Sequence, residues 1–319
     1  MANVLSEQAL SDALASALAS GPHRSRLAAI VDRMPNAQSS TFVSEIVTCQ
    51  LDGDVKLTLL CKYETFRRSN ARDHGACGHR RGNGYEADVY RHILEPMGGV
   101  APRWYGVHRD GPTGTTCLFL EYLDGAEHPE SAAMMPQAAT ALADFHERGK
   151  PFASRAEATF LAVYDRDFYA GWAHRTAAFT ESLGENNRWV SDVCARFAQY
   201  GGPELERHPT VIHGEYYRKN MLVHGGRLYG IDWESCAIGA AEIDVAMLID
   251  GWSDESVTVV EHYARARWPE GDRTFARRFA IAQMYVHFRW LGDQPHSTPS
   301  ELWRLEDLRA ASERAGLLT

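Results

Sequence analysis

The spacing of hydrophobic positions changes along the chain, and the first segment has a helical period. Four leucines between residues 5 and 18 recur at helical spacing, and Gly21-Pro22 ends this repeat. Further apolar residues between positions 27 and 31 continue the pattern as far as Pro35. The pattern predicts two helical pieces within residues 3–34 that pack on the first domain, with partner binding as the alternative.

From Ser39 the pattern changes to alternating apolar and polar positions, which is typical of strands. Asp52-Gly53-Asp54 separates two such runs and indicates a hairpin turn. The elements expected in this part of the chain are strands over residues 41–49, 56–63, 102–107 and 115–123 and a helix over residues 85–94. The first part of the chain is therefore predicted to form an antiparallel sheet with one helix.

The second part of the chain is predicted to be mostly helical. Helical periodicity is expected over residues 136–148, 154–207, 245–249, 273–291 and 301–315. Six aromatic residues recur in the second of these stretches: Phe160, Tyr164, Phe168, Tyr169, Trp172 and Trp189. Such a stripe indicates core packing more often than a ligand pocket, and both alternatives stay open. The fold class expected from these elements is α+β.

Composition narrows the class of protein. The chain has 319 residues, 45% of them hydrophobic, which is enough for more than one compact unit. A net charge of −9 gives no general attraction to nucleic acid or anionic membranes. The chain has no long apolar run, no signal-peptide pattern at its start, and six scattered cysteines without a CxxC motif. We expect a cytoplasmic protein with no nucleic-acid or membrane partner; no feature of the sequence indicates its oligomeric state.

One polar loop followed by a hairpin carries the strongest chemical signal. Glu215 and Asn220 follow a short apolar strand, and Gly225-Gly226 provides a tight turn between two further strands. Because the hairpin returns the chain, Asp232 at its end is expected beside the loop. Carboxylate and amide oxygens suit Mg²⁺, and a remaining carboxylate can accept a proton from a hydroxyl.

Each short motif alone is common by chance, but their spacing is more specific. Asn220 follows Glu215 by five positions, as Asn follows Asp in the kinase catalytic loop H-R-D-x-x-x-x-N. The motifs are His213-Gly214-Glu215, Asn220, Ile231-Asp232-Trp233-Glu234 and Glu242-Ile243-Asp244-Val245-Ala246. In this pattern the sequence resembles the aminoglycoside phosphotransferase family of small-molecule kinases. The resemblance implies a bilobal protein-kinase-like fold, with an antiparallel sheet and a helix in the N-lobe and a mostly helical C-lobe.

The resemblance also implies roles for individual residues. Glu215 occupies the position of the catalytic base, and Asn220 and Asp232 are implied to hold Mg²⁺. His213 and Asp244 are implied to brace the loop. Glu215 departs from the family pattern, because most of the family has Asp at this position. Glu keeps the carboxylate but adds a methylene group.

A lysine in the first part of the chain fits the same family. Lys62 shares a strand face with Thr58 and Leu60, and a lysine on a mainly apolar face needs an anion. The family's lysine at the end of this strand binds nucleotide phosphates and pairs with a glutamate on the next helix. Glu86 is the matching glutamate.

Two further segments are candidates for nucleotide contacts: the one before the first strand and the end of the last strand. The segment before the first strand has no glycine, so the hydroxyls of Ser39 and Ser40 are candidates for a phosphate contact. The family's hinge corresponds to main chain near Glu121 and Leu123, which implies binding of the adenine or guanine base. We place the lobe boundary here, with a nucleotide-binding lobe over residues 1–123 and a catalytic and acceptor-binding lobe over residues 124–319.

Residues 67–84 are rich in Arg, His and Gly and lack an apolar period, so we expect a loop. His74, Cys77 and His79 raise the alternative of a zinc site, but three ligands on one short loop are a weak signal. A role facing phosphate or an anionic substrate is favoured.

The expected activity is transfer of the γ-phosphoryl group of ATP or GTP to a hydroxyl of a small molecule. Arginines among the aromatics of the second part (Arg277, Arg278 and Arg289) favour an acceptor that is less cationic than an aminoglycoside. An antibiotic or a glycosylated or nucleoside natural product, phosphorylated for resistance or self-protection, fits this description. The alternative is a kinase-like nucleotide- or ligand-binding protein without turnover. Phosphorylation of proteins is disfavoured because the protein-kinase motifs His-Arg-Asp, Asp-Phe-Gly and Ala-Pro-Glu are missing.

Overall fold

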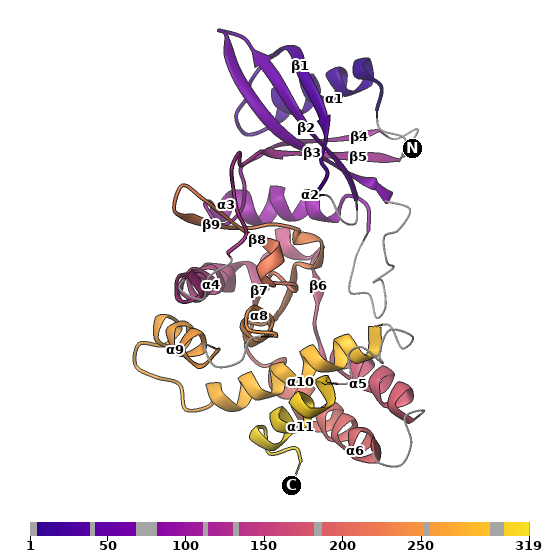
Figure 1. Cartoon of the computed structure of the whole chain (residues 1–319), viewed down its shortest axis with the longest axis vertical. Helices are drawn as coiled ribbons and strands as arrows, with labels where there is room; N and C mark the ends of the chain where they lie inside the picture. The colour runs from indigo at the N-terminus through magenta and orange to yellow at the C-terminus, as the bar shows by residue number, and fades with distance from the viewer. Residues whose placement is uncertain are drawn as a thin grey trace. The chain divides into compact units, whose positions relative to one another are not determined.

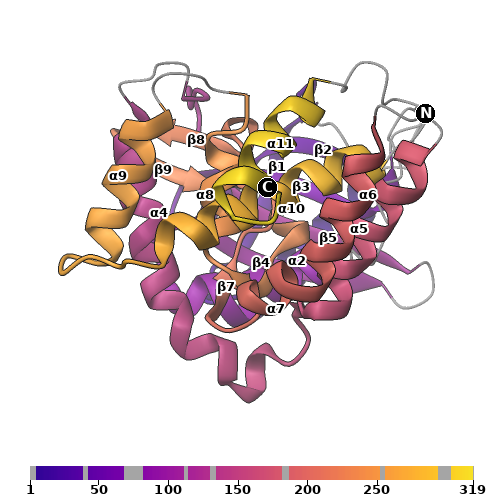
Figure 2. The ribbon, with the colours of Figure 1, turned by 90° about the horizontal axis from the view of Figure 1, so that it is seen from below.

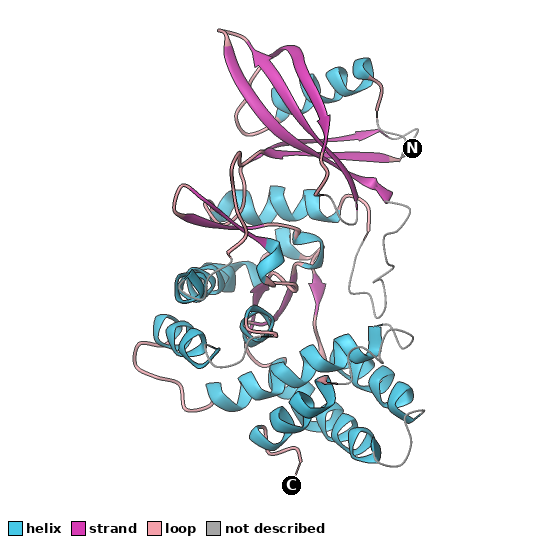
Figure 3. Ribbon diagram, in the orientation of Figure 1, coloured by secondary structure: helices cyan, strands magenta, loops and turns pink. Residues whose placement is uncertain are grey.

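The computed structural model describes residues 5–38, 42–67, 82–110, 114–129, 134–181, 187–251, 256–293 and 303–318. These residues pack into two compact units (Figures 1 and 3). The first unit holds the described residues up to Glu127 together with Leu222–Glu234, and the second holds those of His128–Met221 and Ser235–Thr319. The functional division after Leu123 stays a prediction.

The first unit is built on a five-stranded antiparallel sheet with the strand order β1-β2-β3-β5-β4. The β2–β3 hairpin turns at Gly53 and Asp54, which both have positive φ, as the sequence predicted for this segment. The strands are β1 (Leu27–Pro35), β2 (Phe42–Leu51), β3 (Val55–Arg67), β4 (Trp104–Asp110) and β5 (Thr115–Glu121).

Helix α1 (Glu7–Ser20) confirms the first expected helix. Ser6 caps its N-terminus by accepting a hydrogen bond from the Ala9 N–H at 3.2 Å. Leu10, Leu14 and Leu18 are buried and belong to the same hydrophobic cluster as the apolar face of the sheet. The helical spacing of these leucines therefore reflects real burial of one helix face.

The second expected helical piece is wrong, because Leu27–Pro35 forms strand β1. Its pairing with β2 is interrupted by two register shifts, so the half-buried positions are Leu27, Ile30 and Arg33, three residues apart. A regular strand would bury every second residue. The irregular pairing thus produced a spacing that resembles a helix, while β-branched Ile30 and Val31 favour the strand.

Two further elements complete the first unit. The helix expected at 85–94 is present as one continuous helical run, α2 (Tyr85–Val89), a π-helical turn (Tyr90–Leu94) and α3 (Glu95–Met97). The hairpin of β8 (Met221–His224) and β9 (Arg227–Gly230) turns at Gly225 and Gly226, both with positive φ, as predicted. Backbone hydrogen bonds between Val223 and Glu127 attach this hairpin to the rest of the unit.

The second unit is mostly helical, as the periodicity predicted. Its helices are α4 (Met135–Gly149), α5 (Arg166–Thr180), α6 (Arg188–Arg196), α7 (Gly202–Leu205), α8 (Glu242–Leu248), α9 (Ser256–Arg267), α10 (Phe275–Asp293) and α11 (Arg304–Arg314). A small sheet has the order β6-β10-β7, with β6 (Ala162–Val163), β7 (Pro209–Ile212) and β10 (Ala237–Ala240). Short 3₁₀ turns cover Lys150–Ser154, Ala156–Ala158 and Arg218–Asn220, and a π-helical turn covers Phe197–Gly201. A further 3₁₀ turn, Trp233–Ser235, begins in the first unit and ends in the second.

Helix α10 is the centre of this helical unit. It packs against α5, α8 and α11 (Figure 2), and most of its side chains between Phe275 and Gly292 are buried. Tyr164, Tyr169 and Trp172 belong to the same hydrophobic cluster and are almost completely buried. This favours core packing over a pocket for these aromatics. Within the described ranges, no helix combines the length and apolar character that crossing a bilayer requires.

Candidate functional site

Lys62 is the centre of a charged cluster in the first unit. Its Nζ lies 2.6 Å from Glu86 Oε2 and 2.6 Å from Asp232 Oδ1. The side chains of Lys62 and Glu86 are only 10% and 2% exposed. Burial alone would lower the pKa of Lys62, but Asp232 and Glu86 outweigh it and raise that pKa well above its usual value. The predicted pairing of Lys62 with Glu86 is therefore confirmed as a contact.

Asp232 ends the β8–β9 hairpin in an unusual backbone conformation. Its φ is +61°, a region that non-glycine residues seldom adopt and that Asp tolerates better than most. The next N–H, of Trp233, donates to Glu86 Oε1 at 3.0 Å, so Glu86 binds both Lys62 and the backbone beside Asp232. The Asp232 side chain stays 35% exposed. The carboxylate is thus fixed on one side and accessible on the other.

Glu64 is a buried carboxylate that the sequence interpretation missed. It lies two positions after Lys62 on β3, and therefore on the same strand face. It accepts hydrogen bonds from the backbone N–H groups of Gly84 and of Ala87, the latter at 3.1 Å. Burial and the nearby charge of Glu86 raise the pKa of Glu64 to about 8. Glu64 caps the start of α2 and so fixes the turn that carries Glu86.

In the second unit, Asp244 holds the loop that follows β7. Its Oδ2 accepts the His213 N–H at 2.7 Å and its Oδ1 accepts the Gly214 N–H at 2.9 Å. His146 of α4 places Nε2 3.1 Å from the same Asp244 Oδ2 and Nδ1 2.8 Å from the Tyr263 hydroxyl. Burial lowers the pKa of His146, although Asp244 opposes this. The bracing contact implied for Asp244 is present, and His146 and Tyr263 extend it.

Gly214 allows the loop to pass close to the backbone of Ser235. Its φ is +79°, and a Cβ there would lie 2.2 Å from the Ser235 carbonyl oxygen. Only glycine fits this position. The chain therefore turns sharply just before Glu215, and the His213 ring supports the turn by accepting the Glu215 N–H at 3.3 Å.

Glu215 is buried against helix α10. It is 7% exposed, and the Arg289 guanidinium donates to Glu215 Oε1 and, at 3.1 Å, to the Gly214 carbonyl oxygen. Burial alone would lower the pKa of Arg289, but Glu215 raises it above its ordinary value. In the sequence, Arg289 lies among the aromatics of the candidate acceptor segments, and nothing there indicates a contact with Glu215. No local pattern joins two residues so far apart in the chain.

Asn220 is oriented by the same loop. Its side-chain Nδ2 donates to the Glu215 carbonyl oxygen at 2.9 Å, and its backbone N–H donates to Tyr217 at 2.8 Å. These bonds commit the amide nitrogen, so the amide oxygen is the atom suited to a cation. Asn220 belongs to the second unit and Asp232 to the first. Their joint role as metal ligands stays a prediction.

The donor atoms fit magnesium in their chemistry. The Asn220 amide oxygen and the Asp232 carboxylate are hard oxygen ligands, which Mg²⁺ accepts in small numbers while phosphate and water complete its shell. Among the residues that the structure describes, no three or more His, Cys, Asp or Glu side chains gather as a metal-binding group. The alternative zinc ligands His74, Cys77 and His79 lie outside the described residues, as do Ser39 and Ser40.

Two backbone groups of the candidate hinge already form hydrogen bonds within the protein. The Glu121 N–H donates to the Arg103 carbonyl oxygen at 2.8 Å, and the Leu123 carbonyl oxygen accepts the Ala126 N–H at 3.1 Å. A base bound at this segment would contact other backbone groups, or displace these bonds. The base-binding role of Glu121 and Leu123 therefore stays a prediction.

The family is decided by the sequence of the central part of the chain. Residues 84–279 match the phosphotransferase enzyme family. The chain belongs to this family. The matched segment includes the four motifs on which the resemblance rests, from His213 to Ala246, and also Glu86.

Several solved structures of small-molecule kinases share the fold at low sequence identity. A GDP complex of aminoglycoside 2′-phosphotransferase-IIIa is 14% identical, covers 91% of this chain and 94% of its own, and has a TM-score of 0.58. The macrolide 2′-phosphotransferase type I is 17% identical, with 99% of both chains covered and a TM-score of 0.54. A choline/ethanolamine kinase family protein from Mesorhizobium loti is 16% identical, with 93% and 92% covered and a TM-score of 0.54. No curated protein matches this phosphotransferase in sequence.

These similarities confirm the protein-kinase-like fold that the resemblance implied. The antiparallel sheet of the first unit and the helical second unit correspond to that fold class.

Proposed function

We propose that this phosphotransferase moves the γ-phosphoryl group of ATP or GTP to a hydroxyl of a small molecule. The observation that carries the proposal is the charged cluster of Lys62, Glu86 and Asp232. A lysine held between a buried and a partly exposed carboxylate can exchange its contact with Asp232 for one with a nucleotide phosphate. Glu86 would keep the ammonium in place during this exchange.

We propose that Asn220 and Asp232 hold the divalent cation that accompanies the nucleotide. When bound, Mg²⁺ neutralises negative charge on the phosphates, which is the main catalytic need in phosphoryl transfer. The exposed side of Asp232 and the oriented amide of Asn220 support this assignment.

Glu215 is the proposed general base. A base must lie within about 2.6–3.2 Å of the hydroxyl whose proton it takes, and it must be ionised to accept that proton. The contact with Arg289 favours the ionised carboxylate, and the bonds of Asp244 to the preceding backbone fix the loop. Glu215 would orient the acceptor hydroxyl and receive its proton as the new P–O bond forms. The bond from the γ-phosphorus to the β–γ bridging oxygen breaks in the same step, and the nucleoside diphosphate is the leaving group.

The acceptor is proposed to be a neutral or weakly cationic hydroxyl compound. The names of the similar structures include aminoglycoside, macrolide and choline or ethanolamine enzymes, so this fold accommodates acceptors of different charge. In the present chain, the Glu215 carboxylate forms an ion pair with the Arg289 guanidinium. A polycation would find a carboxylate here that is already paired. An antibiotic or a glycosylated or nucleoside natural product fits better, with resistance or self-protection as the biological role.

The alternative proposal is a nucleotide- or ligand-binding protein without turnover. The departure at Glu215 motivates it. The intact Lys62–Glu86–Asp232 cluster argues against this alternative, because a protein that only binds a ligand has no need for such an arrangement.

A nucleotide-consumption screen tests the proposal. The protein is incubated with Mg²⁺ and either ATP or GTP against a library of hydroxylated antibiotics and metabolites. Acceptor-dependent formation of ADP or GDP supports phosphotransfer. Nucleotide binding without turnover across the library, in the presence of Mg²⁺, would favour the binding protein instead.

A further inference from the structure

Helix α10 carries two buried arginines on one side. Arg278 and Arg289 are eleven residues apart, which is close to three turns at 3.6 residues per turn. Both guanidinium groups bind carboxylates on other elements of the second unit. α10 therefore contacts the segments around the loop at two places along its length.

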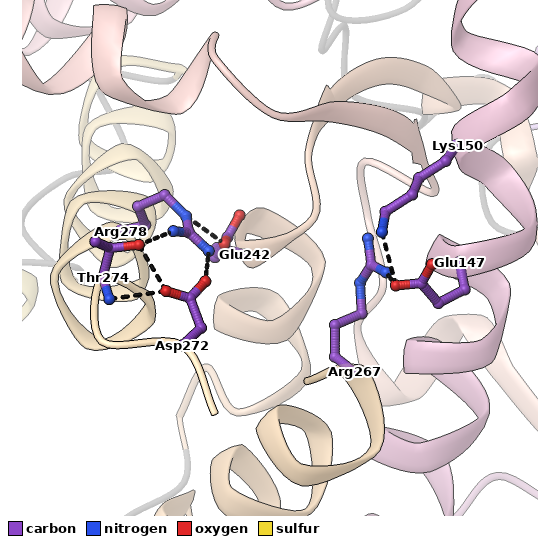
Figure 4. Close-up of polar contacts among 7 residues, drawn as sticks. All are labelled: Glu147, Lys150, Glu242, Arg267, Asp272, Thr274 and Arg278. Atoms are coloured by element: carbon purple, nitrogen blue, oxygen red, sulfur yellow. Dashed lines mark hydrogen bonds and ion pairs between the residues drawn. The ribbon is translucent and has the colours of Figure 1, made fainter. Parts of the chain in front are cut away.

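Arg278 secures the start of α8. Its Nε lies 2.8 Å from Glu242 Oε1, and its Nη2 lies 2.8 Å from Asp272 Oδ2. Both contacts are drawn in Figure 4. Thr274 completes the group by donating to Asp272 from both its N–H and its hydroxyl. Glu242 is two residues before Asp244, the carboxylate that binds the loop backbone. Arg278 thus holds the helix that presents Asp244.

Arg289 binds the loop itself. One nitrogen donates to the Glu215 carboxylate and the other to the Gly214 carbonyl oxygen. One rigid, planar guanidinium group therefore holds both the Glu215 side chain and the Gly214 backbone. Arg289 and Glu215 have side chains that are each only 9% exposed, so solvent screens the pair weakly.

The pairing also gives a physical reason for glutamate at this position. A glutamate carboxylate extends one methylene further from the backbone than an aspartate, and here it meets a cation carried by α10. An aspartate on the same backbone would leave a gap toward Arg289.

We propose that Arg289 is a positioning residue for Glu215, so that the ion pair makes glutamate a competent base where most of the family has aspartate. This inference rests on the proposed function, because it assigns the support of the proposed base. Arg289 stays protonated throughout, and its task is to fix the carboxylate and keep it ionised.

A double-mutant cycle tests this inference. The variants are Arg289→Met, Arg289→Lys, Glu215→Gln and the double variant Glu215→Gln/Arg289→Met. The control is Arg304→Met, which removes another buried arginine of this unit that pairs with Asp250 at 2.8 and 3.0 Å. Steady-state kinetics with the acceptor found in the screen and thermal unfolding are measured for each protein.

We expect Arg289→Met to lower kcat by about ten- to a hundredfold, the scale of a misplaced catalytic group, with the nucleotide KM nearly unchanged. Arg289→Lys should recover part of kcat. In the Glu215→Gln background, the loss of Arg289 should cause little further decrease, because the group it positions is gone. Arg304→Met should lower the Tm without lowering kcat.

Two results would overturn the inference while the proposed function stands. One is that Arg289→Met lowers kcat by the same factor in the parent protein and in the Glu215→Gln variant. The other is a loss from Arg304→Met as large as that from Arg289→Met. A parent protein without any turnover overturns the proposed function instead. In that case the Tm values still test the coupling of Arg289 with Glu215. If the two residues are coupled, the double variant loses less Tm than the two single variants lose together.

Discussion

At the scale of single residues, the proposed chemistry depends on carboxylates held by cations. Lys62 fixes Asp232 in the first unit, and Arg289 fixes Glu215 in the second. The sequence predicted Glu215 and Asp232 from motifs of fixed spacing, and Lys62 from its strand face and the family resemblance. It could not predict Arg289 or the role of Glu64, because these contacts depend on how distant segments pack.

Replacement of Glu215 tests its role as the base. Glu215→Gln keeps the shape but cannot accept the proton, so kcat should fall by at least about a hundredfold, with nucleotide affinity nearly intact. Glu215→Asp should keep part of the activity, because the carboxylate remains but its reach shortens. Steady-state kinetics on both variants provide the measurement. Turnover of Glu215→Gln at the parent rate would exclude Glu215 as the base.

Asp232 should be tested with asparagine rather than alanine. Asparagine tolerates the backbone at φ +61° better than alanine, so Asp232→Asn removes the charge with less strain. We expect the affinity for nucleotide in the presence of Mg²⁺ to fall by at least about tenfold, because a close contact with a charged group is lost. The Tm should stay near that of the parent protein. Calorimetric titration with nucleotide, with and without Mg²⁺, measures the affinity. Equal affinity of both proteins in Mg²⁺ would remove Asp232 from the metal site.

His287 gives a prediction for the pH dependence of stability. Burial lowers the pKa of His287 from 6.5 to about 4, so the folded protein keeps this ring neutral where the unfolded chain protonates it. The resulting stability is fully present above pH 6.5 and is lost as pH falls from 6.5 towards about 4. The loss is at most roughly 3 kcal/mol, from 1.36 kcal/mol per pKa unit.

His287→Gln removes this titrating group and provides the comparison. Urea unfolding of both proteins between pH 7 and 4 should show the parent losing more free energy of unfolding than the variant over that range. Parallel curves for the two proteins would contradict the assignment to His287.

At the scale of elements, α10 organises the second unit and the sequence identified it well. A long run of apolar and aromatic positions predicted residues 273–291, and the structure has Phe275–Asp293. β1 is the contrary case, because its register shifts space the half-buried positions three residues apart. Strand pairing with β2, which is not visible in a local window, decides its conformation.

Removal of Arg278 should destabilise the protein through α10. Arg278→Met leaves Glu242 buried without its cation, and breaking a buried pair in this way costs about 3 kcal/mol. Chemical denaturation measures the change. Arg277→Met is the matched control, because Arg277 on the same helix is 45% exposed where it pairs with Glu204. The control should cost about 1 kcal/mol or less. Equal effects of the two substitutions would contradict a special role for Arg278.

Figure 4 also shows a second cluster, which links two other helices of the unit. Arg267 at the end of α9 binds Glu147 of α4, and Lys150 lies 2.8 Å from the same carboxylate. Burial and the charge of Arg278 lower the pKa of Arg267 to about 10. Arg267 therefore stays charged at neutral pH, and the pair attaches α9 to the helix that carries His146.

At the scale of the whole molecule, the chain builds two compact units, and the proposed reaction needs residues of both. The β8–β9 hairpin belongs to the first unit although it follows the loop of the second in sequence. The family motifs predicted the fold, because their spacing is set by the fold itself. The acceptor was not predictable, since its contacts depend on side chains without fixed spacing.

The most direct test of the account is transfer of the phosphoryl group itself. The protein is incubated with γ-labelled ATP or GTP, Mg²⁺ and the acceptor found in the screen, and the acceptor is analysed by mass spectrometry and for label. The account predicts one labelled phosphoryl group on an acceptor hydroxyl, formed only with Mg²⁺ and greatly reduced in Asp232→Asn. Label that appears only as free phosphate, or an acceptor phosphorylated equally well by Asp232→Asn, would contradict it.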